Sequence, residues 1–344
     1  MREMKDSGIS WINEIPGNWN VEPIKYSYRL IAGATPESTN VDFWDGDIKW
    51  ITPADFKTKD VFVTGGSRNL TVEGYKSCST SMLPIGSIVF SKRAPIGTVA
   101  ITADKLCTNQ GCLGLVEKSG RALNKFYFYV ISIYGEVFNL YGSGTTFKEI
   151  SANTFANIKL PMPPIQEQKR IVGFLDAKCV EIDALTADIQ TQIDTLEQYK
   201  RSVITEAVTK GLNPDAEMKD SGIEWIGEIP ATWDIIRGKY LLKYLQKPVK
   251  EDDGVITCFR DGEVTLRSNR REDGFTMSDK EIGYQGIDAG DLVVHGMDGF
   301  AGAIGISDSR GKASPVLNVM DTKQNKRYIM YYLRSMAYSD VFVA

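Results

Sequence analysis

Apolar residues recur every seven positions along the segment from Ile165 to Lys210, which holds no proline and a single glycine. A sustained seven-residue repeat predicts an α-helix with one apolar stripe of the coiled-coil type, about 45 Å long over roughly 30 residues. Gly211 and Pro214 supply the signals that end it. Because such a stripe must be buried, the pattern favours packing against a second long helix; a helix lying along its own domain is the alternative. The repeating positions are Leu175, Ile182, Ile189, Leu196 and Val203.

The segments on either side of this helix repeat one another. Residues 4–20 and 218–234 are identical at 12 of 17 positions. An offset of 214 residues is too long for a solenoid, so the repeated unit is a whole domain with its connector. A weaker repeat at 86–102 and 290–307 has short apolar runs bounded by glycine, which predict a β-hairpin in each domain. Two copies of a purely structural hairpin would explain this weaker repeat equally well.

These patterns predict an α+β fold. Two similar mixed α/β domains, at residues 1–160 and 215–344, are separated by a long coiled-coil helix within residues 161–214. Two similar domains on a rigid helix suggest a protein that contacts two places at a fixed separation.

Composition excludes several classes of protein but does not identify the function. Apolar residues make up 42% and charged residues 24% of the chain, as in ordinary globular proteins. No apolar run is long enough to span a membrane, and residues 1–10 lack the apolar core of a signal peptide. Five scattered cysteines are typical of a reduced chain, so we expect a soluble cytoplasmic protein. The net charge of −4 neither favours nor excludes a nucleic-acid partner.

The residues needed for catalysis are missing from the sequence. His295 is the single histidine, and at the end of an apolar strand a histidine is more often packed than catalytic. No cysteine or histidine cluster has zinc spacing, so we expect no metal. Gly305–Lys312 resembles a phosphate loop, but five residues rather than four separate its glycines, and Ala313 stands where Ser or Thr is required. The sequence therefore predicts a non-enzymatic protein without a cofactor.

Several polar stretches are suited to contacts with DNA. Asn, Gln and Arg side chains can read base edges in the major groove, and hydroxyls, backbone amides and cations bind phosphates. For each stretch taken singly, a solvated turn or charged face is the alternative. The candidate DNA-binding residues are Thr52, Lys57, Ser91, Lys92, Arg93, Asn109, Gln110, Thr145 and Lys148 in the first domain, and Arg260, Arg267, Arg270, Arg271 and His295 in the second.

These stretches resemble motifs of the specificity subunit of type I restriction–modification systems, and the resemblance extends over essentially the whole chain. The junction formed by YKRSVITEAVTKG (199–211) and MKDSGIEW (218–225) is highly specific for that family. The other similar segments are WITPAD (50–55), RAPIG (93–97), TNQG (108–111), LPMPPIQEQ (160–168), FRDGEVTLR (259–267) and HGMD (295–298).

The resemblance implies two target-recognition domains, each reading one half of a split double-stranded DNA site. It also implies a central helix that sets the gap and docks methyltransferase and restriction subunits, which carry the catalysis and use S-adenosylmethionine and ATP. Family members usually close with a second long helix that pairs with the first, and this sequence ends at Ala344 without one. We therefore expect either a shortened chain or a homodimer through residues 165–210.

Two alternatives stay open from the sequence. One is a truncated scaffold that dimerises through the central helix without productive recognition of DNA. The other is an enzyme that acts alone on DNA, which would need the cofactor or metal motif that the sequence lacks.

Overall fold

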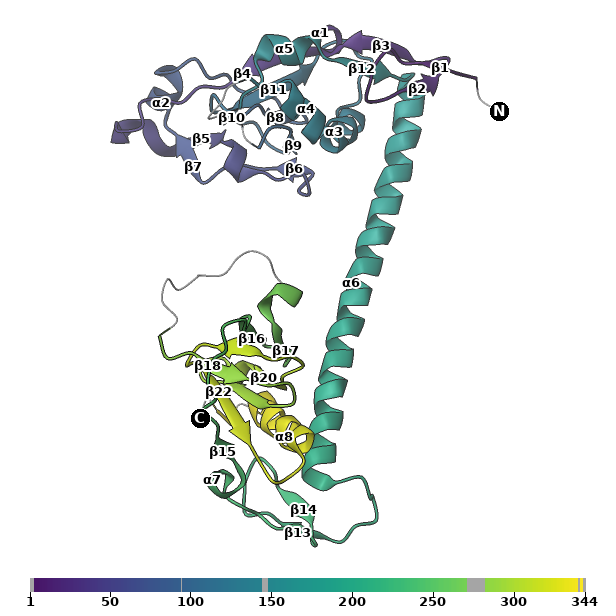
Figure 1. Ribbon diagram of the computed structural model, residues 1–344. Coiled ribbons are helices and arrows are strands. Elements are labelled where there is room, and N and C mark those ends of the chain that lie inside the picture. The colour runs from purple at the N-terminus through teal and green to yellow at the C-terminus, as the bar shows by residue number, and fades with distance from the viewer. Residues whose placement is uncertain (1–2, 94, 144–147, 271–281, 340, 343–344) are drawn as a thin grey trace. The chain divides into compact units, whose positions relative to one another are not determined.

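The computed structural model describes residues 3–93, 95–143, 148–270, 282–339 and 341–342 (Figure 1). The chain divides into two compact units, Met1–Ala184 and Leu185–Ala344. The division falls within one helix, α6 (Ile165–Lys210), so each unit holds part of it. Thr145 and Arg271, two of the candidate DNA-binding residues, lie outside the described residues.

Unit 1 is built around a five-stranded sheet with the order β4-β11-β8-β9-β6. A smaller sheet, β10-β5-β7, lies beside it, and α3 packs against β9. The helices are α1 (Ile24–Ser27), α2 (Val72–Lys76), α3 (Asn124–Ile133), α4 (Gly135–Leu140) and α5 (Ala152–Asn157). The strands are β1 (Met4–Asp6), β2 (Glu14–Pro16), β3 (Asn20–Pro23), β4 (Tyr28–Ala32), β5 (Trp44–Ile51), β6 (Phe62–Val63), β7 (Arg68–Leu70), β8 (Ile88–Ser91), β9 (Val99–Thr102), β10 (Cys107–Thr108), β11 (Cys112–Glu117) and β12 (Lys159–Met162).

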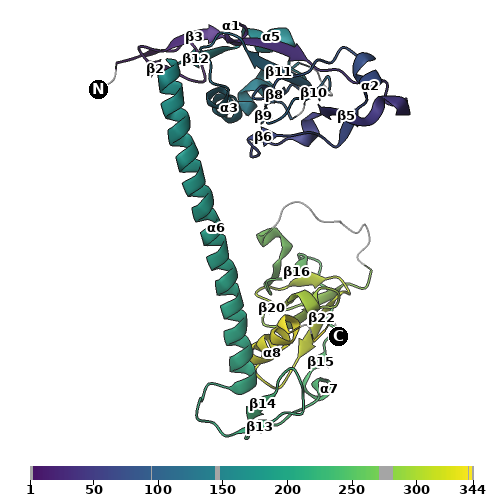
Figure 2. The same cartoon turned by 180° about the vertical axis from the view of Figure 1, so that it is seen from behind.

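Unit 2 repeats this arrangement on a smaller scale. Its sheet has the order β15-β22-β19-β20, the counterpart of β4-β11-β8-β9, and α8 packs against β20 as α3 packs against β9 (Figure 2). The helices after α6 are α7 (Gly238–Leu241) and α8 (Lys326–Tyr338). The strands are β13 (Met218–Asp220), β14 (Glu228–Pro230), β15 (Lys243–Tyr244), β16 (Ile256–Cys258), β17 (Val264–Leu266), β18 (Gln285–Ile287), β19 (Leu292–His295), β20 (Ile304–Ile306), β21 (Gly311–Ala313) and β22 (Leu317–Asp321).

The repeated sequence forms the same small hairpin in both units. β1 pairs with β2 and β13 with β14, both antiparallel and in equivalent registers. In each copy a glycine with positive φ turns the chain, at Gly8 (+65°) and Gly222 (+69°), because glycine adopts this conformation without steric cost. The preceding aspartates accept a hydrogen bond from these glycine amides at 2.9 Å. The Asp-Ser-Gly sequence is thus repeated because the turn requires it.

The predicted hairpins at 86–102 and 290–307 are confirmed. β8 pairs antiparallel with β9, and β19 pairs antiparallel with β20. Every residue of β8 and β9 is buried, so these two strands form the centre of the unit 1 core. Burial on both faces explains why their sequence reads as an unbroken apolar run rather than an alternation.

The predicted helix is confirmed with the expected limits. α6 is a single α-helix of 46 residues, which corresponds to about 69 Å at 1.5 Å per residue. Its first turns are fixed to unit 1: the buried Gln168 side chain donates to the carbonyls of Arg121 and Pro163, both at 2.8 Å, and accepts from the Leu123 amide. Further along, Asp176 accepts from Lys125 and Tyr129 at 2.7 Å.

The apolar stripe of α6 is exposed over most of its length. The exposed fractions are 59% for Ile182, 48% for Ile189, 65% for Leu196 and 44% for Val203, while Leu175 is half-buried. A helix that packed this face along its own domain would have covered these side chains, so that alternative from the sequence is wrong. The stripe is an exposed apolar surface along the helix.

Candidate nucleic-acid interface

Two of the candidate segments of unit 1 meet where β5 and β10 end. The two strands run parallel, with Cys107 opposite Trp50. The Asn109 amide donates to the Ile51 carbonyl at 2.9 Å, so Asn109 lies beside Thr52. The Thr52 hydroxyl caps the short 3₁₀ helix that follows it, accepting from the Ala54 amide and donating to a carboxylate. Parallel pairing therefore brings together residues 57 positions apart in the sequence.

The turn after β8 joins the same edge. The Lys92 amide donates to the Gly111 carbonyl at 2.9 Å, and the Lys92 carbonyl accepts from the Ile150 amide at 2.9 Å. Arg93 forms an antiparallel bridge with Glu149. The segments around residues 52, 92–93, 109–111 and 148–150 are thus connected by backbone hydrogen bonds, and they carry Thr52, Lys92, Arg93, Asn109, Gln110 and Lys148.

Glu149 holds the two cations of this edge. Its carboxylate accepts from Lys92 Nζ at 2.6 Å and from Arg93 Nε at 2.7 Å. The hydrogen bond from Lys92 lowers the pKa of Glu149 below its ordinary value; burial opposes this effect, and the hydrogen bond from Arg93 adds to it. The role of Glu149 has no signal in the sequence, because this carboxylate lies 56 positions from Arg93.

The other unit 1 candidates have different environments. Ser91 is fully buried, and its hydroxyl donates to the Arg93 carbonyl at 2.8 Å, so it supports the turn from inside. Gln110 is exposed and accepts from the Thr35 hydroxyl, while Asn109 is half-buried and accepts from the Gly111 amide. Lys57 and Lys148 are exposed. Only the exposed members can reach a ligand without rearrangement.

In unit 2 the structure pairs two of the candidate arginines, Arg260 and Arg270, with carboxylates. Arg260 donates to Asp298 at 2.9 Å. Arg270 binds Asp261 and Glu263, and its guanidinium lies 4.2 Å from the centre of the Phe259 ring. The hydrogen bond from Arg270 lowers the pKa of Asp261 below its ordinary value. The charges of Arg260 and Arg270 are therefore balanced by nearby carboxylates.

Arg267 and His295 have side-chain roles in the fold of unit 2. Arg267 Nε donates to the Thr257 hydroxyl at 3.2 Å, across the β16–β17 pair. His295 Nδ1 accepts from the amides of Met297 and Asp298, at 3.3 and 2.9 Å, and orders the loop after β19. The histidine ring is thus hydrogen-bonded within its own loop, as the sequence favoured.

The described residues form no metal cluster, and Cys107 and Cys258 are buried thiols. No group of three His, Cys, Asp or Glu side chains among them is placed to hold a metal ion. Burial raises the pKa of Cys107 and of Cys258 to about 12, so both remain protonated thiols at neutral pH. None of the described helices is long and apolar enough to cross a membrane.

A family model described as the type I restriction modification DNA specificity domain matches residues 16–195, more than half of the 344 residues. The chain belongs to this family. The match covers the unit 1 edge described above and the first part of α6. The assignment from the quoted motifs is therefore confirmed.

Individual members of the family are similar over shorter stretches. The MjaIX specificity subunit of Methanocaldococcus jannaschii is 34% identical over 167 residues, which is 48% of this chain and 38% of that protein. The putative MjaX specificity subunit of the same organism is 28% identical over 211 residues, covering 60% and 46% of the two chains. The matched segments thus span less than half of these relatives.

A solved structure shares the fold. The HsdS subunit from Thermoanaerobacter tengcongensis aligns over 95% of this chain and 81% of its own, with a TM-score of 0.52 and 13% identity. At this identity the likeness concerns the fold alone, and it confirms the predicted α+β architecture with two similar domains and a long central helix.

Proposed function

We propose that this chain is the sequence-specific DNA-recognition subunit of a type I restriction–modification complex. Membership of the DNA specificity family carries the proposal. In this role residues 1–160 and 215–344 are two target-recognition domains, residues 161–214 form the spacer, and each domain reads one half of a split target. The chain itself is non-catalytic, and methyltransferase and restriction subunits dock on it.

The unit 1 edge supports recognition of a duplex. Gln110 and Arg93 are exposed and lie on adjacent loops that rigid strands fix in place, and their amide and guanidinium groups suit adenine and guanine edges. Lys92, Lys57 and Lys148 supply cations of the kind that bind phosphates. Base-reading and phosphate-binding groups together are the combination that sequence-specific binding requires.

The exposed stripe of α6 supports docking of partner subunits. It presents apolar side chains at Ile182, Ile189 and Leu196 over several helical turns. A rigid helix can hold two recognition surfaces at a set distance and still offer its apolar face to other proteins.

Gel-shift titration with duplexes that carry the cognate split site, a scrambled site and a site with an altered gap tests the proposal. We expect binding to the cognate duplex to weaken steeply with salt, by about 10³-fold between 50 and 200 mM for six phosphate contacts. Preference for the cognate site should persist at each salt concentration. Equal affinity for all three duplexes at every salt concentration would contradict the proposal.

Glu149→Gln is a matched variant for this titration. It removes the charge that holds Lys92 and Arg93 while keeping the shape of the side chain. We expect tighter binding to all duplexes, because Lys92 and Arg93 no longer have to break an ion pair with a carboxylate before they contact a DNA phosphate. Glu37→Gln, an exposed carboxylate in the same unit without an ion pair among the described residues, is the control and should leave the affinity unchanged.

An interaction protein that associates through α6 without reading DNA is the second candidate. The exposed stripe favours it, as does the pairing of Arg260 and Arg270 with carboxylates. The same titration separates the two: a scaffold would bind DNA without sequence preference or not at all.

A further inference from the structure

A further segment of unit 1, residues 33–37, joins the edge that carries Gln110. The Ala34 amide donates to the Thr108 carbonyl at 2.9 Å, so the segment runs beside the end of β10. Gly33 makes this close approach possible, because a Cβ atom there would lie 2.2 Å from the Thr108 carbonyl oxygen. Backbone contacts thus hold the segment next to Gln110, although the two are far apart in the sequence.

Two tryptophan side chains fix the path of this segment. The Trp50 indole N–H donates to the Ala34 carbonyl at 3.1 Å, and the Trp44 indole N–H donates to the Glu37 carbonyl at 3.4 Å. Both rings are buried and pack against each other, with their centroids 5.1 Å apart. A buried indole holds its single donor in one place. The two hydrogen bonds therefore leave the backbone between residues 34 and 37 little freedom.

Thr35 presents its hydroxyl on this fixed backbone. It precedes Pro36, and the residue before a proline is restricted to extended conformations. Its branched side chain has a single χ angle with few allowed rotamers. The Thr35 hydroxyl donates to Oε1 of Gln110. A stiff side chain on a stiff backbone thus holds the end of a longer and more flexible one.

The contact leaves the NH₂ group of Gln110 free. Gln110 is exposed, and this group donates no hydrogen bond to any residue that the structure describes. The backbone before it is fixed by the hydrogen bond from the Asn109 amide to Ile51, at 2.9 Å. The backbone after it is fixed by the hydrogen bond from the Lys92 amide to the Gly111 carbonyl, also at 2.9 Å. The side chain therefore presents two N–H donors from a rigid loop, with its oxygen already bonded.

The fixed amide changes which base Gln110 suits. An amide that is free to turn matches adenine, which presents one acceptor, N7, and one donor, N6, in the major groove. Guanine presents two acceptors there, N7 and O6. Because a hydroxyl already occupies one lone pair of the Gln110 oxygen while both N–H donors remain, the arrangement favours guanine over adenine.

We propose that Thr35 is a positioning residue that sets the base preference of Gln110. It holds the amide with the NH₂ group toward the DNA, so that Gln110 reads guanine at one base pair of the half-site bound by unit 1. Removal of the hydroxyl lets the amide turn and accept a hydrogen bond from adenine as well. This inference rests on the proposed role in DNA recognition and adds a residue that lies outside the quoted motifs.

Selection from a library of duplexes with a randomised segment tests the proposal, with sequencing of the duplexes that the full chain retains. We expect wild type to enrich guanine at one position, and Gln110→Ala to lose that preference by about tenfold. Thr35→Val keeps the shape of the side chain and removes the hydroxyl. It should lower the ratio of guanine to adenine at the same position by about three- to tenfold. Thr35→Ser keeps the hydroxyl and should retain the ratio.

Two comparisons separate positioning from general damage to the edge. Thr39→Val removes an exposed hydroxyl of the same loop, one that donates to Glu37 at 3.3 Å, and should leave the preference at every position unchanged. In the Gln110→Ala background, Thr35→Val should have no further effect, because its effect passes through the amide.

The outcomes distinguish this inference from the proposed function. If wild type enriches no sequence, both are wrong. If wild type enriches a sequence but Thr35→Val leaves the ratio of guanine to adenine unchanged, or weakens the preference equally at all positions, only the positioning role is wrong. The positioning role is also overturned if Gln110→Ala loses no preference, or if the preference that it loses is for a base other than guanine.

Discussion

Ion pairs with nearby carboxylates set the orientation of the candidate cationic side chains. Glu149 positions Lys92 and Arg93, and Asp298 and Asp261 hold Arg260 and Arg270. These pairs are partly exposed, so each contributes little to folding stability. Their effect is to fix the direction of long side chains. Under the proposed function, binding to DNA would replace a carboxylate partner by a phosphate or a base.

Arg93→Ala and Arg267→Ala test the assignment of base-reading residues. We expect Arg93→Ala to relax the preference at one half of the target and Arg267→Ala at the other, each by about 1–3 kcal/mol of discrimination, because a guanidinium reads guanine with two hydrogen bonds. Binding to duplexes with single base changes in each half measures this. A uniform loss on all duplexes would identify phosphate contacts instead.

An ion-pair network in unit 2 makes its stability depend on pH. Asp288 accepts from Lys247 and Arg310, and these hydrogen bonds, that from Lys247 first, lower the pKa of Asp288 to about 2. A carboxylate with a depressed pKa in the folded state contributes stability above its ordinary pKa near 4, and this contribution is lost as pH falls through the folded value. Asp253, paired with Arg310, shifts in the same direction.

We therefore expect Asp288→Asn to lower the free energy of unfolding at pH 7 and to reduce the loss of stability between pH 4 and pH 2. Urea unfolding at several pH values measures both. Asp308→Asn, an exposed aspartate of the same unit, serves as the control. Identical pH dependence in wild type and Asp288→Asn would show that the network does not stabilise the fold.

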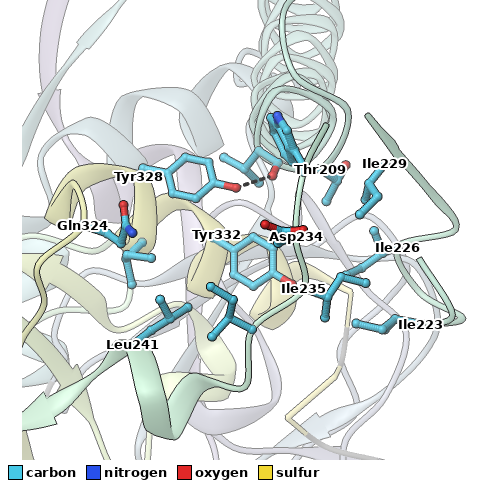
Figure 3. A pocket seen from close by; sticks show the side chains of 14 residues that line it. Thr209, Ile223, Ile226, Ile229, Asp234, Ile235, Leu241, Gln324, Tyr328 and Tyr332 are labelled. Carbon is cyan, nitrogen blue, oxygen red and sulfur yellow. Dashed lines mark hydrogen bonds between the residues drawn. The ribbon is translucent and has the colours of Figure 1, made fainter. Parts of the chain in front are cut away.

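At the scale of elements, the ends and the middle of α6 are stabilised in different ways. Its ends are fixed by specific contacts, such as Gln168 at the start and the Tyr328 hydrogen bond to Val208 near the end (Figure 3). Between them the apolar stripe is solvent-exposed. A helix without a packed face gains little from tertiary contacts, so this middle part depends on helix propensity and on whatever partner covers the stripe.

Ile189→Glu tests whether α6 mediates association. If the chain forms a homodimer through residues 165–210, sedimentation velocity at micromolar concentration should give a dimer for wild type and a monomer for Ile189→Glu. Thr191→Glu, on the opposite face of the helix, should remain dimeric. A wild-type chain that stays monomeric would refute the homodimer. The exposed stripe would then be a surface for contacts with other subunits.

At the scale of the whole molecule, one chain carries two units with the same sheet order and the same entry hairpin. Duplication with divergence preserves the scaffold and varies the loops, which is the arrangement that the proposed recognition of two different half-sites requires. Asp234 and Arg237, which stand where unit 1 has Asn20 and Pro23, are exposed.

Methylome sequencing of cells that carry this chain with its methyltransferase tests the two-domain proposal. We expect one methylated motif made of two short specific sequences with a constant gap, because a single helix connects both recognition units. Exchange of residues 1–160 for those of another family member should change one half of the motif and leave the other half. A continuous motif, or a gap of variable length, would contradict a fixed spacer.

The sequence by itself determined the features that depend on local order. The seven-residue repeat predicted α6, and the prolines before Ile165 together with Gly211 predicted its ends, since periodicity and end signals act over a few positions. The Asp-Ser-Gly turns and the two apolar hairpins followed from glycine placement and short apolar runs for the same reason. The sequence motifs were also sufficient to identify the family.

Only the tertiary structure decided which of the candidate side chains are paired or buried. The pairing of Arg93 with Glu149 and the burial of Ser91 both depend on segments far apart in the chain. A side chain's hydrogen-bond partner is set by how strands pair and how loops cross, and the sequence around that side chain does not encode this. The candidate site was therefore predicted as a set of stretches, and packing decided which of its members can reach a ligand.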